Sequence, residues 1–422
     1  MSAELETRAL RKVTLRIVPF VMLLYFIAFI DRVNIGFAAL TMNKDLGFSP
    51  TVFGVGAGIF FLGYFLFEVP SNLVLYKVGA RIWIARVMIT WGLISGAMAF
   101  VQGPNSFYAV RLLLGLAEAG FFAGVTYYLA AWFPVQTRSR MLAWFLVGIP
   151  VSSLIGAPIS GLLLQMDGIW GLSGWQWLFI MVSLPCVLMG LLVLKLLADR
   201  PQDAAWLTAS ERKALVGMLD AETRERPHTT WWPAIKDIRV LILAAVQFGF
   251  TLGSYGIGIW LPLMLKEYQF SNFAVSMLAA IPYIFASAAM IAWAWHVDRT
   301  GRKIGNLVIT CFLAAVGLVI SVLLTGSLPF ALAGLTLALI GVTSARAIFW
   351  TIPTRFLAGV GAAGGLAFIN SIGTAGGFVG PALMGWLKDV TGSFQNGLLV
   401  MAGIMLVATL LAASLKLVMT RE

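Results

Sequence analysis

Hydrophobic residues run along this chain in long blocks separated by short polar segments, from one end of the sequence to the other. A block of about 20 apolar residues can cross the ~30 Å hydrocarbon core of a bilayer as a helix. The pattern predicts an all-α polytopic membrane protein with about twelve transmembrane helices. We place them at residues 17–38, 52–75, 82–101, 106–131, 140–165, 175–197, 239–265, 274–296, 304–324, 328–351, 362–387 and 394–415.

One charged stretch, residues 198–238, interrupts the hydrophobic pattern near its middle. We interpret it as a cytoplasmic linker between an N-terminal six-helix bundle (residues 1–197) and a C-terminal six-helix bundle (residues 239–422). Within this linker, Thr208 and Glu211 have the spacing of a capping box. That spacing predicts the start of a short amphipathic helix, which fits a surface tether.

The two halves repeat short motifs at a nearly constant separation. YKVGAR at 76–81 matches DRTGRK at 298–303, and GAP at 156–158 matches VGP at 379–381. Both pairs lie about 220 residues apart, which predicts two pseudo-symmetric bundles with a binding site near the membrane midplane between them.

Composition supports the membrane assignment. The chain of 422 residues is 60% hydrophobic and 11% charged, whereas soluble proteins carry roughly 25% charged residues. Most of the Lys and Arg residues lie in the N-terminal tail, alternate loops, the linker and the C-terminal tail, while Lys44, Lys266 and Lys388 lie in the opposite loops. The positive-inside rule then predicts a multi-pass protein of the cell (inner or plasma) membrane with both termini cytoplasmic. The net charge of +11 therefore reflects topology and predicts no nucleic-acid partner.

The residue types that carry metal and enzyme chemistry are sparse. Cys186 and Cys311 fall within predicted helices, and the chain has two His residues. We find no metal-ligand spacing, nucleophile and base signature or phosphate-binding loop. We therefore expect neither an enzyme nor a bound cofactor, and a channel is disfavoured because no pore loop repeats.

Charged residues inside the predicted helices are the strongest functional signal. Asp31 and Glu118 are acids at positions where a charge costs roughly 2.5–3.5 kcal/mol on insertion scales. Arg32 follows Asp31 but points about 100° away on a helix, so each residue should contact a different helix. Arg111 lies seven residues before Glu118, on one helical face. We predict a network in which the acids carry protons and the arginines bind an anion; the alternative is an ion-pair lock that only fixes packing.

Further polar residues extend this hypothesis. Arg346 is a second candidate for anion binding, or a residue reaching toward the membrane surface. Tyr25 shares the face of Arg32, where it lines a cavity or packs the bundle, and Tyr255 could hydrogen-bond an acid. For Glu68, a gate or packing role is favoured over proton transfer.

The motifs resemble those of the major facilitator superfamily, and in particular its anion:cation symporter family, which includes carriers of tartrate, phthalate, hydroxyphenylacetate and galactonate. The resemblance covers nearly the whole chain. It rests on YFIAFIDRVNIGFA (25–38), GYFLFEVPSN (63–72), RLLLGLAEAGFFAG (111–124), FWTIPTRFLAG (349–359) and INSIGTAGGFVGP (369–381).

This resemblance implies proton-coupled uptake of an organic carboxylate by alternating access. It assigns proton coupling to Asp31 and Glu118, and it places Tyr64, Trp350 and Asn370 in the substrate cavity. It also implies a cytoplasmic gating motif, made here by Asp298, Arg299, Gly301 and Arg302. In the first-half copy Tyr76 and Lys77 replace the Asp-Arg pair, which weakens the case for a matching latch there.

The expected partners are a small organic carboxylate, protons and membrane lipid, and we expect a functional monomer. Carriers of sugar acids in this family have an amide in the middle of the fifth helix, where this chain has Ile149 and Pro150. That departure favours an aromatic acid or a short dicarboxylate. The rival hypothesis is an antiporter or exporter of an organic anion or drug-like compound, because GAPISG at 156–161 partly resembles an antiporter motif.

Overall fold

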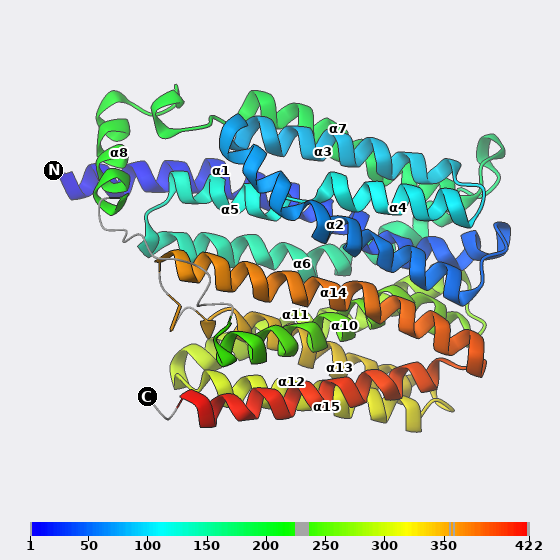
Figure 1. Cartoon of the computed structure of the whole chain (residues 1–422). Helices are drawn as coiled ribbons and strands as arrows, with labels where there is room; N and C mark the ends of the chain where they lie inside the picture. Colours follow the sequence, from blue (N-terminus) through cyan, green and yellow to red (C-terminus); the bar gives the residue numbers. More distant parts are fainter. Residues whose placement is uncertain (1, 224–235, 354–355, 358, 420–422) are drawn as a thin grey trace.

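The computed structural model describes residues 2–223, 236–353, 356–357 and 359–419, and these residues form a bundle of long helices without a β-strand (Figure 1). The α-helices are α1 (Ser2–Asp45), α2 (Pro50–Val78), α3 (Ala80–Ala97), α4 (Pro104–Glu118), α5 (Phe121–Trp132), α6 (Val135–Leu164), α7 (Gly174–Leu196), α8 (Ala209–Thr223), α10 (Ile238–Lys266), α11 (Asn272–Thr300), α12 (Lys303–Leu323), α13 (Leu328–Phe349), α14 (Gly359–Thr391) and α15 (Phe394–Met419).

The predicted fold class is confirmed. Eleven helical segments of the described part are long and apolar enough to cross a membrane, and α6 occupies the place of the fifth predicted helix. The fourth predicted span, 106–131, corresponds to the membrane-spanning segment Pro104–Trp132, which a break divides into α4 and α5. The division places Glu118 at the very end of α4, next to the break.

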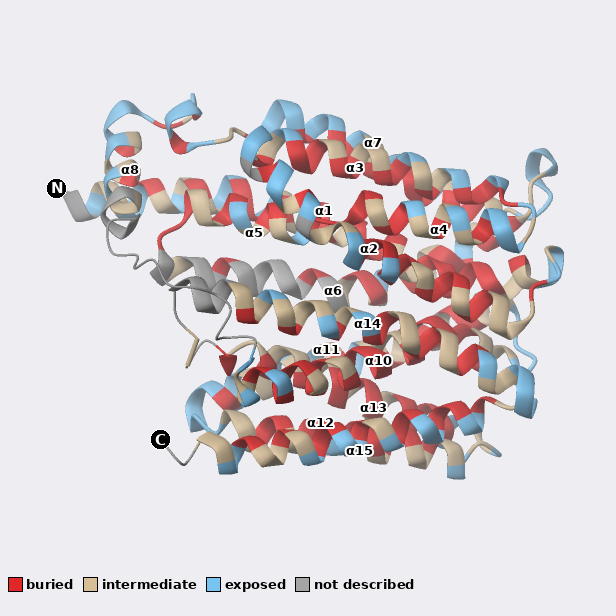
Figure 2. Ribbon diagram, viewed as in Figure 1, coloured by how far each residue is buried: buried red, intermediate tan, exposed pale blue. Residues whose placement is uncertain are grey.

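Among the described helices, those from the two parts of the chain pack along three seams. In these seams α2 contacts α14, α6 contacts α11, and α1 contacts α10. Both chain ends lie at one end of the bundle, which we call the terminus end, and the opposite end is the far end (Figure 1). Figure 2 shows buried residues where helices face one another. Large apolar side chains such as Leu410 and Leu73 are exposed on the outside, as a lipid-facing surface requires.

The linker helix α8 is attached to the extended start of α1. As predicted, Thr208 and Glu211 form a capping box: the Thr208 amide donates to Glu211 Oε2 (3.0 Å), and the Glu211 amide donates to Thr208 Oγ1 (3.3 Å). Lys12 Nζ on α1 lies 2.7 Å from Glu211 Oε1. Trp206 stacks on Trp132 of α5 at a centroid separation of 5.7 Å. Residues 224–235 of the predicted linker lie outside the described part.

The contact between α8 and α1 should depend on pH. Hydrogen bonds from Lys12 and the Thr208 amide lower the pKa of Glu211 from its usual value near 4.5 to about 2. An acid with a depressed pKa contributes its stabilisation above the unfolded pKa and loses it as the pH falls through the folded pKa. We therefore expect α8 to stay attached at neutral pH and to detach between about pH 4.5 and pH 2. Spin labels on α1 and α8 would report the separation, and Glu211→Gln should lack this acid-dependent step.

Candidate functional site

An ion pair between Arg32 of α1 and Glu118 of α4 lies inside the first half of the bundle. Arg32 Nη2 contacts Glu118 Oε1, and the two side chains are only 17% and 3% exposed. Three aromatic rings surround the guanidinium, with the Phe29, Phe60 and Tyr64 centroids 5.4, 5.4 and 5.5 Å from its carbon. A pair so well removed from water costs several kcal/mol of desolvation per ion.

Asp31 points to a different helix, as its position predicted. Its carboxylate accepts hydrogen bonds from Trp91 Nε1 (2.5 Å) and Ser95 Oγ, both on α3, and from Asn34 Nδ2 (3.2 Å). The residue is 2% exposed. Among the described residues, Asp31 forms no ion pair with an arginine, so the predicted network of two acids and two arginines is not assembled by direct contacts. Sequence reasoning missed Trp91 and Ser95, although their spacing of four residues puts both on one face of α3.

Arg111 is also buried, but it contacts backbone rather than acid. Its Nε donates to Gly56 O (3.2 Å) and its Nη2 donates to Ala57 O (2.9 Å), both on α2. Its guanidinium carbon lies 5.0 Å from the ring of Phe60, which it shares with Arg32. In this conformation Arg111 therefore joins α4 to α2.

The break between α4 and α5 places Glu118 at a helix end, where it contacts Arg32. Ala119 leaves the helical conformation (ψ 131°) and Gly120 is left-handed (φ 89°), so the helix stops at Glu118. The freed carbonyl of Ala119 accepts a hydrogen bond from Ser71 Oγ (2.7 Å), and Trp83 Nε1 donates to the same hydroxyl (3.1 Å). Backbone groups inside a membrane need such partners. A continuous apolar pattern did not reveal this break, and Gly120 was its only local signal.

Gly120→Ala should destabilise the protein. A Cβ at this position would lie 1.9 Å from Ser71 Oγ, and a non-glycine residue at positive φ carries about 1–3 kcal/mol of strain. We expect a lower midpoint of thermal unfolding in detergent. Gly124→Ala is the matched control on α5, because its Cβ would meet its nearest neighbour at 3.4 Å. Equal midpoints for the two variants would contradict this explanation of the break.

The second half contributes Arg346 of α13 and Tyr255 of α10. Arg32 Nη1 donates to the Tyr255 hydroxyl (3.4 Å) across the seam between α1 and α10. The guanidinium carbon of Arg346 lies 5.9 Å from the centroid of the Tyr255 ring and 6.0 Å from that of Phe250. Tyr255 therefore contacts arginines from both halves. The structure thus brings Arg32 and Arg346, two of the arginines predicted to bind an anion, to the same tyrosine.

The predicted tyrosine of α1 is buried beside the helix break. Tyr25 is 6% exposed and stacks on Phe121, directly after the helix break, at a centroid separation of 6.3 Å. Tyr25 therefore packs the bundle beside the helix break, and its cavity-lining role stays a prediction.

The remaining predicted cavity residues occupy different places. Asn370 of α14 donates through Nδ2 to Glu68 Oε1 (3.0 Å) and accepts from Gln247 Nε2 (3.4 Å). Trp350 directly follows α13, and its ring lies 5.4 Å from that of Phe349. The side chains of Ile149 and Pro150 lie outside the described residues.

The predicted gating motif forms the turn between α11 and α12. Gly301 is left-handed (φ 67°) and its amide donates to Val297 O (2.9 Å), which ends α11. Arg299 lies over the ring of Trp295 at 3.6 Å. Arg302 precedes α12, and its carbonyl accepts from the Asn306 amide (3.2 Å). Asp298 is exposed and makes no ion pair with another described residue.

In the first half, the equivalent turn is held by a residue from outside the motif. Arg81 donates to Asp199 through its backbone amide (2.9 Å), and its Nε lies 3.3 Å from Asp199 Oδ2. Asp199 follows α7 at the start of the linker. This turn therefore has an acidic partner even though its own motif lacks the Asp-Arg pair.

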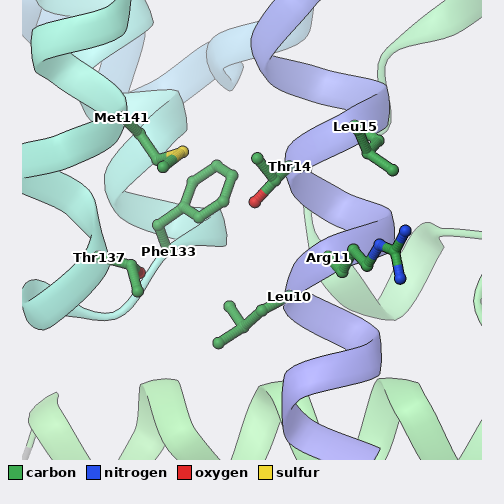
Figure 3. A pocket seen from close by; sticks show the side chains of 7 residues that line it. All are labelled: Leu10, Arg11, Thr14, Leu15, Phe133, Thr137 and Met141. Carbon is green, nitrogen blue, oxygen red and sulfur yellow. The ribbon is translucent and has the colours of Figure 1, made fainter.

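A separate cavity of about 290 Å³ opens between α1 and α6 toward the terminus end (Figure 3). Arg11 and Thr14 of α1 and Met141 of α6 lie along it. None of the predicted site residues lines this cavity, so it does not belong to the arginine cluster.

Comparison with known proteins gives three results. The model of the Major Facilitator Superfamily matches residues 21–368 and 243–422. A protein of Agrobacterium vitis named "Putative tartrate transporter" is 55% identical over 412 residues, covering 97% of this chain and 95% of the relative. A "Quinolone resistance transporter" of Acinetobacter baumannii is 42% identical over 412 residues, with coverage of 97% and 95%.

Solved structures show the same architecture. The crystal structure of a bacterial homologue of the human lysosomal transporter Spinster, in an inward-facing and occupied conformation, has a TM-score of 0.76. It is 14% identical in sequence, and the match covers 94% of this chain and 95% of that one. At this level of identity, the likeness establishes the fold alone.

Proposed function

Because the chain belongs to the major facilitator superfamily, we propose that it is a secondary transporter that takes up a small organic carboxylate together with protons. The observation that carries this proposal is the desolvated Arg32–Glu118 pair beside an arginine of the opposite half. The relative named for tartrate, 55% identical over nearly the whole chain, points to the same class of substrate.

Coupling follows from competition for one arginine. Arg32 keeps its charge at all relevant pH values, whereas Glu118 can be protonated. Ionised Glu118 holds Arg32 through the observed ion pair. When Glu118 takes a proton, this hold weakens and Arg32 becomes available to a substrate carboxylate. Substrate and proton then bind together, which is the requirement for symport.

Asp31 is proposed as the second proton-linked acid. Its described partners are the neutral donors Trp91, Ser95 and Asn34. Protonation would therefore remove a buried charge without leaving an arginine unpaired. The Oδ1 atom of Asn34 is buried without a hydrogen-bond partner, so rotation of this amide would supply an acceptor for the new O–H group.

A dicarboxylate fits the arginine cluster best. Arg32 and Arg346 approach Tyr255 from the two halves, so one carboxylate could bind to each arginine while the tyrosine hydroxyl donates to either. Arginine binds carboxylates through a planar pair of donors, which gives orientation as well as affinity. A hydroxylated four-carbon diacid such as tartrate carries the two carboxylates that this arrangement requires.

The distribution of basic residues and the two-bundle organisation bear on orientation and motion in the membrane. The terminus end, which carries the basic tails and loops, would face the cytoplasm of a cell whose inner or plasma membrane holds the protein. The bundles 1–197 and 239–422 would rock against each other around the site, joined by the linker 198–238. We expect a monomer to be sufficient, because both halves of the site come from one chain.

Export of an organic anion or drug-like compound is the alternative function. It is supported by the relative named for quinolone resistance, which is 42% identical over nearly the whole chain. The two functions differ in the direction of transport: an inward proton gradient would expel the compound in one case and accumulate it in the other.

A thermal-shift screen of the purified protein tests the substrate class. The panel contains tartrate, succinate, phthalate, 4-hydroxyphenylacetate, galactonate and a quinolone. Dicarboxylates are expected to raise the unfolding midpoint in the parent but not in Arg32→Gln, because a ligand stabilises only the state that binds it. Stabilisation by the quinolone alone would favour export.

A further inference from the structure

Helices α2 and α14 pack together across the two halves for most of their length. At the far end of this seam their backbones touch: a Cβ at Gly54 would lie 2.4 Å from Pro381 O, and one at Gly58 would lie 2.6 Å from Phe378 O. A Cβ at Gly385 would likewise lie 2.2 Å from Pro50 O. Such contacts let two helices approach closely, so the seam is closed at the far end.

A carboxylate of the second half caps α2 at the far end of the seam. Asp389, near the end of α14, accepts a hydrogen bond from the Thr51 amide at 2.7 Å. Thr51 is the second residue of α2, where the amides have no partner within the helix. A negative charge at this place also interacts favourably with the helix dipole.

A second polar contact joins the same helices toward the terminus end. Glu68 of α2 accepts from Asn370 Nδ2 of α14 at 3.0 Å, and Gln247 of α10 orients the other end of this amide at 3.4 Å. Glu68 forms no ion pair with a described Lys or Arg. Its carboxylate therefore binds the opposite half through a charge-assisted hydrogen bond from Asn370 of α14.

The two contacts lie on either side of the arginine cluster. Thr51 and Glu68 are about 25 Å apart along α2 at 1.5 Å per residue, a distance close to the hydrocarbon thickness. The Arg32 to Tyr255 hydrogen bond crosses between the halves on a neighbouring seam. Parting of the halves at either end would break the contact at that end and could leave the other intact.

From this placement we propose that Asp389 and Glu68 are opposed gate residues: Asp389 holds the far end closed through Thr51, and Glu68 holds the terminus end closed through Asn370. This inference rests on the alternating access included in the proposed function. It gives Glu68 the gating role left open by its sequence position, and it adds Asp389, which the sequence did not single out.

Opposite shifts in one reporter test this proposal. Ser276 on α11 is fully buried against α6 in another seam: a Cβ at Gly161 would lie 2.6 Å from Ser276 Cβ. Ser276→Cys, in a background lacking the two native cysteines Cys186 and Cys311, reports opening at the far end. The measurement is the rate at which a membrane-impermeant maleimide labels this cysteine in the full-length protein.

Asp389→Ala is expected to raise the labelling rate about tenfold, because it removes one charge-assisted hydrogen bond that favours the closed far end. Glu68→Ala is expected to lower the rate by a similar factor, because it favours opening at the terminus end. Asp389→Asn and Glu68→Gln keep a neutral acceptor and should give smaller shifts in the same directions. Asp45→Ala is the control. Asp45 accepts from Trp175 Nε1 at 2.9 Å within the first half, so its loss should leave the rate unchanged.

Two results would overturn the proposal: shifts of the same sign for Asp389→Ala and Glu68→Ala, or an Asp389→Ala rate equal to that of Asp45→Ala. The labelling assay needs no substrate, so it is independent of the transport assignment. Opposite shifts in a protein that accumulates no carboxylate would support the gates and remove the proposed function.

Discussion

Arg32→Gln is expected to abolish carboxylate uptake, with a loss of at least about 100-fold in apparent affinity. Arg32 is the only one of the proposed anion-binding arginines that is described in direct contact with a proton-linked acid, Glu118. Glutamine removes the permanent charge and the planar pair of donors that carboxylates recognise. Arg32→Lys keeps the charge but loses this geometry, so it should restore only a small part of the affinity.

Concentration-dependent uptake of radiolabelled substrate into proteoliposomes measures this loss. Arg8→Gln serves as the control, because Arg8 lies 3.5 Å from Glu211 and its side chain is 70% exposed. Its uptake should equal that of the parent. Near-normal uptake by Arg32→Gln, at equal incorporation of protein, would show that another cation binds the substrate.

Glu118→Gln is expected to separate exchange from accumulation. The glutamine resembles a permanently protonated Glu118, so Arg32 stays available to the substrate at every pH. Exchange of internal for external substrate should therefore continue, whereas an imposed proton gradient should no longer drive accumulation above equilibrium. The expected loss is complete for accumulation, because a residue that cannot release its proton cannot couple to the gradient.

The measurement compares counterflow with gradient-driven uptake in the same proteoliposomes. Asp45→Asn is a matched carboxylate control at the far end, where Asp45 contacts Trp175, and it should retain both activities. If Glu118→Gln still accumulated substrate against its gradient, proton coupling would have to be assigned elsewhere, with Asp31 the first residue to test.

The sequence pattern was sufficient to predict most of the fold. Hydrophobic blocks of membrane-spanning length predicted the helices, because lipid imposes one length and one backbone solution on each crossing. The capping box of Thr208 and Glu211 correctly predicted the start of α8. The family resemblance is likewise confirmed by the match over most of the chain.

The break at Gly120 could not be predicted in the same way. It is stabilised by a hydrogen bond from Ser71 on another helix, and hydropathy carries no information on such a tertiary partner. The pairing of Arg32 with Glu118 was among the predicted combinations, but helical spacing alone did not choose between Arg32 and Arg111. That choice depends on the carbonyls of Gly56 and Ala57, which hold Arg111 away.

Accumulation of tartrate in proteoliposomes tests the central claim most directly. The liposomes contain the parent protein and neutral buffer, and the external buffer is made acidic at zero membrane potential. Proton-coupled uptake predicts that internal tartrate transiently exceeds the external concentration, and that a protonophore abolishes this excess. Equilibration without any excess, or expulsion of preloaded tartrate under the same inward gradient, would contradict it.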